Sequence, residues 1–259
     1  MEVPVSTLVA WVNAYVWPFA RIGAMLSVAP VFGARIFPMR VRLVLAVTLT
    51  FAVEPFVGAV PSFNGLSGEG LLVMIHQILT GITMGLILQV GFASLIIGGQ
   101  IVALSMGLGF ASVVDPQNGV QVPIVSQFYL VIGTLLFFAL DGHLTLVEVI
   151  ASSFQSLPVD QTGLSPSVFL GLASWSALMF AEGLRIALPV LSVVLLANIA
   201  FGVATRSAPQ INLFAVGFAA TLLIGFGAMW VALSDFGPVF ARLLEVSFRM
   251  VDAVVRARP

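Results

Sequence analysis

The feature that most constrains this chain is a series of apolar stretches, most of them longer than one membrane crossing requires. Prolines, glycines and charged residues separate six of them, at about 5–32, 41–60, 70–104, 124–157, 166–204 and 209–256. As one straight helix, residues 166–204 would be about 58 Å long, roughly twice the hydrocarbon thickness of a bilayer. Such helices must bend, fold back or leave the membrane. We expect bends at these breakers: Pro18, Asp141-Gly142, Pro189, Gly81, Gly85, Gly91, Gly98 and Gly99.

The composition excludes a soluble protein. Hydrophobic residues make up 60% of the 259 positions and charged residues 8%, with a mean hydropathy of +1.14. Soluble domains carry about 25% charged residues, so a third of that density cannot cover a globular surface. The 24 glycines and 21 phenylalanines, against 2 tyrosines, favour closely packed helices over a porin with aromatic girdles. We predict an integral, all-α membrane protein.

The charged residues exclude several kinds of site. Arginine supplies all 10 cations against 11 acids, and there is no cysteine. This balance gives no argument for a nucleic-acid partner, and the lack of thiols excludes disulfides, thiolate metal sites and cysteine nucleophiles. The first cation is Arg21, so the N-terminus lacks the basic region of a signal peptide, and we expect it to belong to the mature protein.

The arginines give conflicting signals for topology. Arg35, Arg40 and Arg42 lie between the first two stretches, and Arg206 lies four crossings later. Short cation-rich loops stay cytoplasmic, so both loops indicate the same side of the membrane. The arginine-rich C-terminal tail follows one further crossing, which places it on the opposite side. Either one stretch does not cross, or the bundle is not a simple up-and-down one.

The last stretch becomes amphipathic after Trp230. Its charged residues recur every three or four positions and share one helical face, while apolar residues occupy the opposite face. Two interpretations remain open: a surface helix with weak ion pairs, or a helix that docks a partner. The charged face comprises Arg242, Glu245, Arg249, Asp252 and Arg256, and the apolar face comprises Leu244, Phe248, Val251 and Val255.

Catalytic motifs are almost absent. There is no HExxH, and a Walker motif cannot exist without lysine. The single match is the GxSG pattern at 65–68, in which Ser67 could act with His143 as a base. That segment is polar and glycine-rich, which is more typical of a loop followed by a helix start.

Two pairs of ionisable residues interrupt apolar stretches, where a charge in lipid costs at least about 2.5–3.5 kcal/mol. Glu182 and Arg185 are three residues apart and can pair on one helical face, as a structural ion pair or as part of an ion pathway. Asp141 and His143 could relay protons or mark a helix end. We expect the remaining polar residues to form interhelical hydrogen bonds: Arg21, His76, Gln77, Gln89, Gln100 and Asn198.

The segment 105–123 is the most informative. Its glycines, prolines and Asn118 forbid a regular helix, yet its side chains are too apolar for a solvated loop. At membrane depth, irregular backbone is tolerated only where protein buries it or where it lines a cavity. We predict a plug or, alternatively, a buried connector. The candidate gate residues are Met106, Gly107, Leu108, Gly109, Phe110, Val113, Val114, Asp115, Pro116, Gln117, Asn118 and Gly119.

Four blocks carry a family resemblance. They are PFARIGAMLSVAPVFG (18–33), GLGFASVVDPQNGVQVPIVSQFY (107–129), LFFALDGHL (136–144) and RSAPQINLFAVGF (206–218). Together they resemble the FliR family, the export-gate subunits of bacterial flagellar type III secretion.

This resemblance implies a subunit of a gate in the bacterial inner membrane and the flagellar basal body, with FliP, FliQ and FlhB as partners. Unfolded flagellar proteins would be the cargo, with no catalysis, no metal and no cofactor. It implies a FliP-like part at 1–165 fused to a FliQ-like helical hairpin at 166–259, in an array of kinked hairpins. The family's plug loop matches 106–122 of this sequence.

A plug of apolar side chains seals a channel by excluding water. Gly107 and Gly109 would allow the loop to swing aside, while Asp115-Pro116 and Asn118-Gly119 would fix its turn. Two further functions remain alternatives: an injectisome export-gate homologue and a stand-alone secondary transporter that uses Glu182, Arg185, Asp141 and His143.

Overall fold

The described part of the chain is almost entirely helical, as the composition predicts for an all-α membrane protein. The computed structural model describes the backbone of residues 5–58, 60, 67–108, 112–114, 121–160, 163–207 and 213–257. In that part of the chain the elements are α1 (Val5–Val28), α2 (Met39–Val53), the short 3-10 helix η1 (Glu54–Phe56), α3 (Gly68–Ser105), β1 (Ser112–Val114), β2 (Gln121–Pro123), α4 (Ile124–Ala139), α5 (Gly142–Ser156), α6 (Pro166–Ser176), α7 (Leu178–Ser207) and α8 (Leu213–Arg256).

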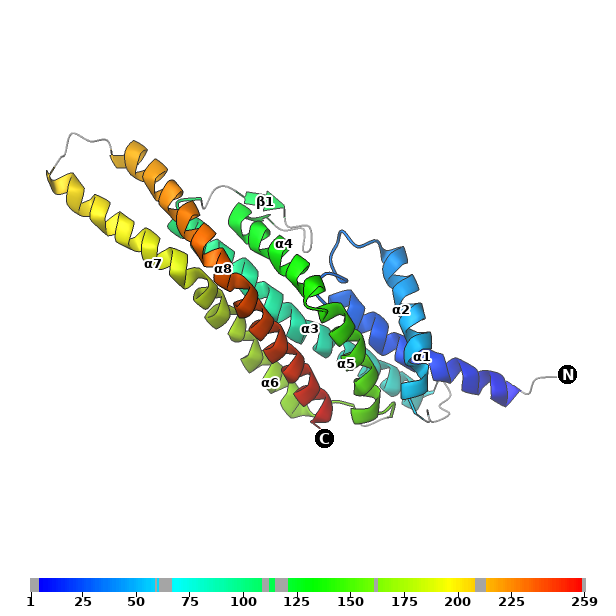
Figure 1. Ribbon diagram of the computed structural model, residues 1–259. Coiled ribbons are helices and arrows are strands. Elements are labelled where there is room, and N and C mark those ends of the chain that lie inside the picture. The colour runs from blue at the N-terminus through cyan, green and yellow to red at the C-terminus, as the bar shows by residue number, and fades with distance from the viewer. Residues whose placement is uncertain are drawn as a thin grey trace.

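Helix α3 is the central element of the bundle, and α1, α4, α7 and α8 all pack against it (Figure 1). Its glycines are the contact points. A methyl group at Gly81 would collide with the backbone of α1, one at Gly98 would lie 3.0 Å from the carbonyl oxygen of Gly183 in α7, and one at Gly99 would collide with Ser126 at the start of α4. Helix α3 continues through these glycines, where they let neighbouring backbones approach closely, and bends at them stay a prediction.

The fourth apolar stretch bends where the sequence indicates. Helices α4 and α5 meet at an angle of 66°, and Asp141 between them adopts a left-handed conformation with φ 55°, which aspartate tolerates better than most residues. Pro18 and Pro189, by contrast, lie inside α1 and α7 and do not end them. The fifth stretch breaks at Ala177, which the sequence does not mark.

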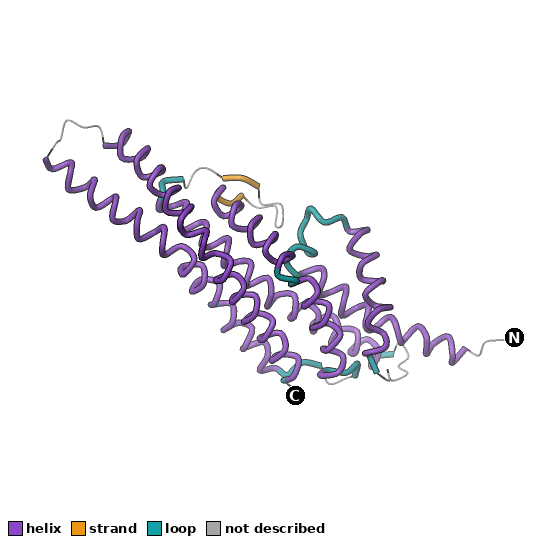
Figure 2. The backbone as a smooth tube through the Cα atoms, in the orientation of Figure 1, coloured by secondary structure: helices purple, strands orange, loops and turns teal. Residues whose placement is uncertain are grey.

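Helices α7 and α8 form a long antiparallel hairpin that packs against α3, and α1 and α2 lie on the other side of α3 (Figure 2). The buried side chains form two clusters along the bundle. One joins α1, α2, α5 and the first half of α3 with the end of α8. The other joins the second half of α3 with α4, α7 and the middle of α8.

Among the described residues, three helical segments are long and apolar enough to cross a membrane: Gly68–Ser105, Pro166–Ala204 and Gly217–Arg256. The bent pair of α4 and α5 makes a possible fourth. In Figure 1 the start of α2 and the end of α7 lie toward the upper edge, while the C-terminus lies at the lower edge.

The segment between α3 and α4 contains a short antiparallel ladder that the sequence does not predict. Val113 pairs with Val122, in the centre of a ladder that joins Ser112–Val114 to Gln121–Pro123. The ladder thus lets these six residues form backbone hydrogen bonds with one another without a helix.

Candidate functional site

The first residues of the 105–123 segment are fixed against α8. Met106 is fully buried, and a methyl group at Gly225 of α8 would lie 2.7 Å from its side chain. Gly107 follows with φ 79° and lies against the ring of Phe218, while Leu108 is half-buried. Glycine adopts this conformation without steric cost. Met106 and Gly107, which we call the root of the segment, are therefore held against α8 of the C-terminal hairpin.

The remaining gate residues are only partly described. Gly109, Phe110 and the run Asp115–Gly119, which includes Pro116, Gln117 and Asn118, lie outside the described residues. For Val113 and Val114 the structure gives the backbone alone. Their role in a plug stays a prediction. Beside the anchored root, a hollow of about 430 Å³ lies between the end of α3 and the α7–α8 hairpin, lined by Leu104, Ser105, Met106, Gly107, Asn198, Phe201, Gly202, Gly217, Phe218 and Thr221.

Glu182 links α7 to α8. It accepts a hydrogen bond from Arg185 at 3.0 Å within α7 and another from Arg242 of α8 at 3.1 Å. The Glu182 side chain is 13% exposed, whereas those of Arg185 and Arg242 are 53% and 48% exposed. The pair that the sequence predicts does form, but its two guanidinium groups lie at the surface. Such an arrangement favours a structural link over an enclosed ion pathway.

The charged side chains at the end of α8 form separate ion pairs. Arg249 pairs with Glu245, and Arg256 pairs with Asp252 at 2.9 Å, each four residues apart. Arg242 does not pair within α8, because its guanidinium contacts Glu182 of α7. The apolar face is turned inward, since Leu244, Val251 and Val255 are buried and Phe248 is half-buried. Arg249 and Arg256 thus each have an acidic partner within α8.

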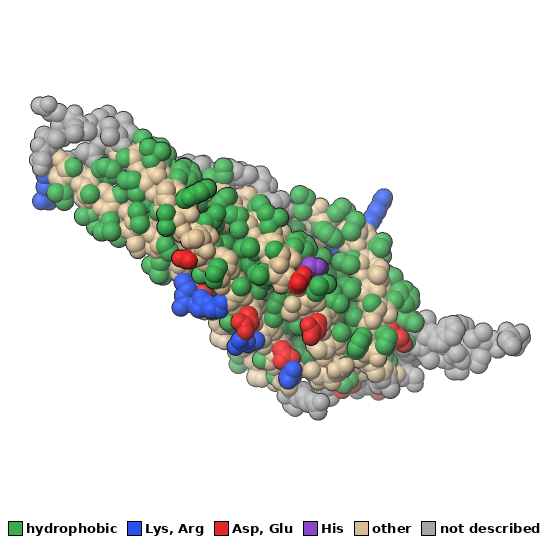
Figure 3. Space-filling model, in the orientation of Figure 1, with side chains coloured by type: hydrophobic (Ala, Val, Ile, Leu, Met, Phe, Trp, Pro, Cys, Tyr) green, Lys and Arg blue, Asp and Glu red, His purple; other side chains and the backbone are tan. Residues whose placement is uncertain are grey.

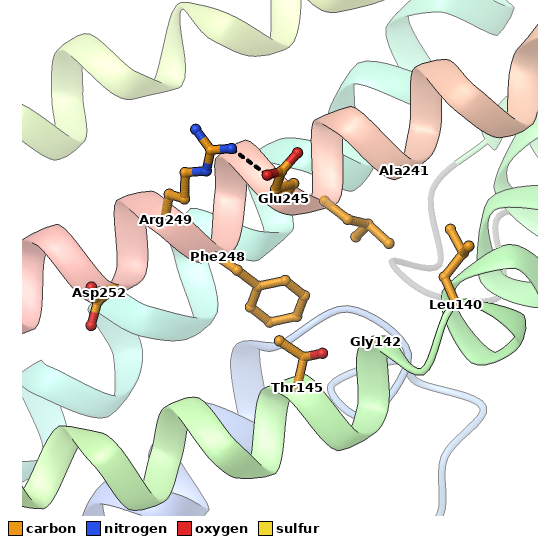
Figure 4. A pocket seen from close by; sticks show the side chains of 9 residues that line it. Leu140, Gly142, Thr145, Ala241, Glu245, Phe248, Arg249 and Asp252 are labelled. Carbon is orange, nitrogen blue, oxygen red and sulfur yellow. Dashed lines mark hydrogen bonds and ion pairs between the residues drawn. The ribbon is translucent and has the colours of Figure 1, made fainter.

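A surface groove of about 560 Å³ separates α8 from the α4–α5 elbow (Figure 4). Thr145 faces Phe248 across it, Leu140 lies at one end, and Glu245, Arg249 and Asp252 are on its α8 side. The groove thus combines an apolar floor with a charged edge. It also places the elbow beside residues 241–245 of α8, at the level of the Glu182–Arg242 contact.

Among the described residues Arg21 is a fully buried charged side chain, and the sequence marks it only as one of several isolated polar residues. Its guanidinium donates to Gln77 Oε1 at 2.8 Å, to the carbonyl oxygen of Ser153 at 3.0 Å and to that of Leu157 at 2.8 Å. It also lies 4.2 Å from the centre of the Phe154 ring. Arg21 therefore connects α1, α3 and the end of α5, as expected of an interhelical hydrogen bond.

Asn198 also bonds between helices, since its Oδ1 accepts from Thr221 of α8 at 3.2 Å. His76 does not follow this expectation, because its buried Nδ1 has no hydrogen-bond partner.

The remaining catalytic candidates are not assembled into a site. Ser67 is the N-cap of α3, where its hydroxyl accepts from the Gly70 amide at 3.1 Å. His143 has a buried Nδ1 without a hydrogen-bond partner, and no hydrogen bond or ion pair joins it to Asp141 in the described part of the chain. Nor does any group of three or more histidines and acids there have the geometry of a metal site.

Comparison with known proteins identifies the family. The family model described as bacterial export proteins, family 1, matches residues 12–246. The chain is 37% identical to the flagellar biosynthetic protein FliR of Pectobacterium carotovorum subsp. carotovorum, covering 96% of this chain and 95% of the relative. It is 34% identical to FliR of Escherichia coli strain K12, covering 100% and 99% of the two chains. With FliR of Aquifex aeolicus it shares 35% identity over 80% of each chain.

These matches confirm the resemblance to the FliR family that the four sequence blocks carry. The family is one of export proteins and not a known enzyme family. Because the family model and the relatives cover nearly the whole chain, this chain belongs to the bacterial export proteins, family 1.

Proposed function

We propose that this chain is a subunit of the flagellar type III export gate in the bacterial inner membrane, within the flagellar basal body. In this proposal it forms a channel with FliP and FliQ through which unfolded flagellar proteins cross, and FlhB contacts the cytoplasmic entrance. The observation that carries the proposal is the similarity to proteins named FliR over 96–100% of this chain. Residues 1–165 would correspond to FliP and the hairpin 166–259 to FliQ.

The exposed apolar side chains of α2 and α4 support the proposal that this chain assembles with other subunits. Helix α2 exposes Met39, Val41, Leu43, Val44, Val47 and Phe51, and helix α4 exposes Ile124, Phe128, Val131, Leu135 and Phe138. Helix α4 lies beside the charged part of the hairpin, since Tyr129 stacks on Phe236 at 5.3 Å and Leu140 faces residues 241–245. Contiguous exposed apolar side chains mark protein–protein or membrane contact surfaces. Next to charged groups they suit protein partners better than lipid tails.

The anchored root of the 105–123 segment suits a gate. Met106 is held by α8, and the positive φ of Gly107 lies directly before the residues proposed as the plug. In this proposal the root stays in place while residues 109–119 close the channel and move aside when cargo enters. Apolar side chains at a constriction block ions by excluding water.

Deletion of the gene in its own bacterium tests the flagellar assignment. We expect loss of the filament and of swimming, with flagellin retained inside the cells and motility restored by the gene on a plasmid. Normal swimming together with lost effector secretion would contradict the flagellar assignment and indicate an injectisome.

A further inference from the structure

The groove of about 560 Å³ between α8 and the α4–α5 elbow, which we call the elbow groove, opens to the surface over an apolar floor. Leu244 is buried there, and Phe248 is half-buried opposite Thr145 (Figure 4). At the elbow itself, Leu140 and Leu144 are 45% and 57% exposed. The groove therefore continues the exposed apolar face of α4, which the proposed function assigns to neighbouring subunits.

The α8 side of the elbow groove is balanced in charge. Glu245 pairs with Arg249 and Asp252 pairs with Arg256, each four residues apart in the same helix. The four side chains are between 41% and 72% exposed, so these pairs are weak and leave the carboxylates accessible to other cations.

The α5 side carries negative charge alone. Asp141 lies between two residues that line the groove, and Glu148 lies one turn after Thr145, which also lines it. Both acids are exposed, and within the described part of the chain no ion pair neutralises either of them. Figure 3 shows acidic side chains over both α5 and the lower part of α8. The border of the groove thus has more carboxylates than guanidinium groups.

These charges select among possible occupants. An acidic border repels the anionic headgroups of phospholipids. A divalent cation is not expected, because the described acids and histidines form no group of three that could hold one. The aliphatic stem of a lysine or arginine, in contrast, can lie over Phe248 while its charged head reaches Glu148. The elbow groove therefore suits a polypeptide that combines apolar and basic side chains.

From these observations we infer that the elbow groove is the docking site for an amphipathic helix of a neighbouring subunit. Apolar side chains of that helix pack on Phe248 and Leu140, and its lysine or arginine side chains bind Asp141 and Glu148. The inference rests on the proposed function and deepens it, because it assigns one defined surface of this chain to a partner of stated charge.

Site-specific photo-crosslinking tests this inference in the assembled complex. p-Benzoylphenylalanine replaces Thr145 in the full-length chain, which is produced in its own bacterium with its natural partners. The membranes are irradiated, the complex is purified by a tag on this chain, and mass spectrometry identifies the linked peptide. Three variants are compared in this background: Glu148→Lys, Glu148→Gln and, as the matched control, Glu54→Lys. Glu54 is an exposed acid of η1 that does not line the groove.

We expect one dominant adduct, with a helix of another protein that has a lysine or arginine within one turn of the linked residue. Glu148→Lys should lower the adduct yield at least about fivefold and Glu148→Gln about twofold, because they reverse or remove one attractive charge. Glu54→Lys should leave the yield unchanged. Replacing the partner's basic residue with glutamate should restore the yield in the Glu148→Lys variant.

An adduct with phospholipid, with a second copy of this chain or with a segment that lacks basic residues would overturn the inference. An adduct yield that Glu148→Lys does not change would also overturn it, as would an assembled complex without any adduct at Thr145. In each of these cases FliP and FliQ still copurify, so the proposed function stands. A chain that copurifies with neither would contradict the proposed function, and this inference with it.

Discussion

At the scale of single residues, the Glu182 carboxylate links α7 to the charged end of α8, two parts of the chain that the sequence pattern does not connect. Glu182 was expected to pair with Arg185, and Arg242 was expected to belong to the charged row of α8. In the structure both guanidinium groups contact Glu182, at 3.0 and 3.1 Å. Each arginine is about half exposed, so each contact by itself is worth little. Together they fix the level at which α7 meets α8.

Replacing Glu182 with glutamine tests this link. We expect E182Q to lower the free energy of unfolding by about 1 kcal/mol, because it loses two ion pairs, one of them between helices. The matched variant E245Q loses one pair within α8 and should cost only about 0.3 kcal/mol. Denaturant unfolding of the purified assembly in detergent measures both. Equal effects of the two substitutions would show that the interhelical contact adds nothing.

Arg21 is the second residue whose substitution is informative. Lysine keeps the charge but cannot reach Gln77, Ser153 and Leu157 together, so buried acceptors would be left without donors. We expect R21K to destabilise the chain by about 2–4 kcal/mol and to reduce its steady-state amount in the membrane. R40K, at an exposed position of α2, serves as the control and should change neither quantity. Wild-type stability in R21K would contradict the role of the guanidinium geometry.

At the scale of elements, the bundle depends on how closely backbones approach α3. Gly81, Gly98 and Gly99 lie where a methyl group would meet the backbone of α1, α7 and α4 respectively. In a membrane, helix association relies on such close packing because lipid provides no hydrophobic drive between helices. The position of these glycines, not their flexibility, explains their presence in an uninterrupted helix.

A pair of glycine-to-alanine substitutions separates packing from helix propensity. G81A should push α1 away from α3 and destabilise the chain by about 1–3 kcal/mol. At Gly227 of α8 nothing lies within 4 Å of an added methyl group, so G227A should be neutral or stabilise by up to about 1 kcal/mol. Unfolding in mixed detergent micelles compares the two. A neutral G81A would mean that the α1–α3 contact is looser than the structure shows.

Sequence patterns anticipated those features that depend on neighbours along the chain. The i, i+3 pair of Glu182 and Arg185, the bend at Asp141 and the apolar face of α8 follow from local spacing. The break at Ala177 does not, because no breaker residue marks it, and the close contacts of the α3 glycines depend on helices that are distant in the sequence. The burial of Met106 under α8 also escaped prediction, since it depends on two segments that are far apart in the sequence.

At the scale of the whole molecule, α2 and α4 each expose a row of apolar side chains. In the proposed function these two faces contact neighbouring subunits. The 105–123 segment begins at the junction between α3 and this hairpin, where Met106 contacts α8. A closure element that begins there would be connected to the protein core through α3 and to the C-terminal hairpin through α8.

Deletion of residues 109–119 tests the plug. Met106 and Gly107 stay in place in this variant, so assembly with the partner subunits should be unchanged. We expect a clear rise in ion leak through the resting gate, because the water-excluding side chains are removed. Sodium flux into vesicles that contain the assembled gate measures the leak. An unchanged leak in a fully assembled gate would rule out the plug assignment.

The central claim, that this chain is a gate subunit and not an independent transporter, is tested most directly by co-expression. The chain is produced in membranes alone, with FliP, with FliQ and with both, and then purified in detergent by a tag on this chain. We predict one monodisperse complex containing all three proteins only in the last case, and aggregation or degradation when the chain is produced alone. A chain that purifies by itself as a stable, monodisperse protein and retains neither FliP nor FliQ would contradict the claim.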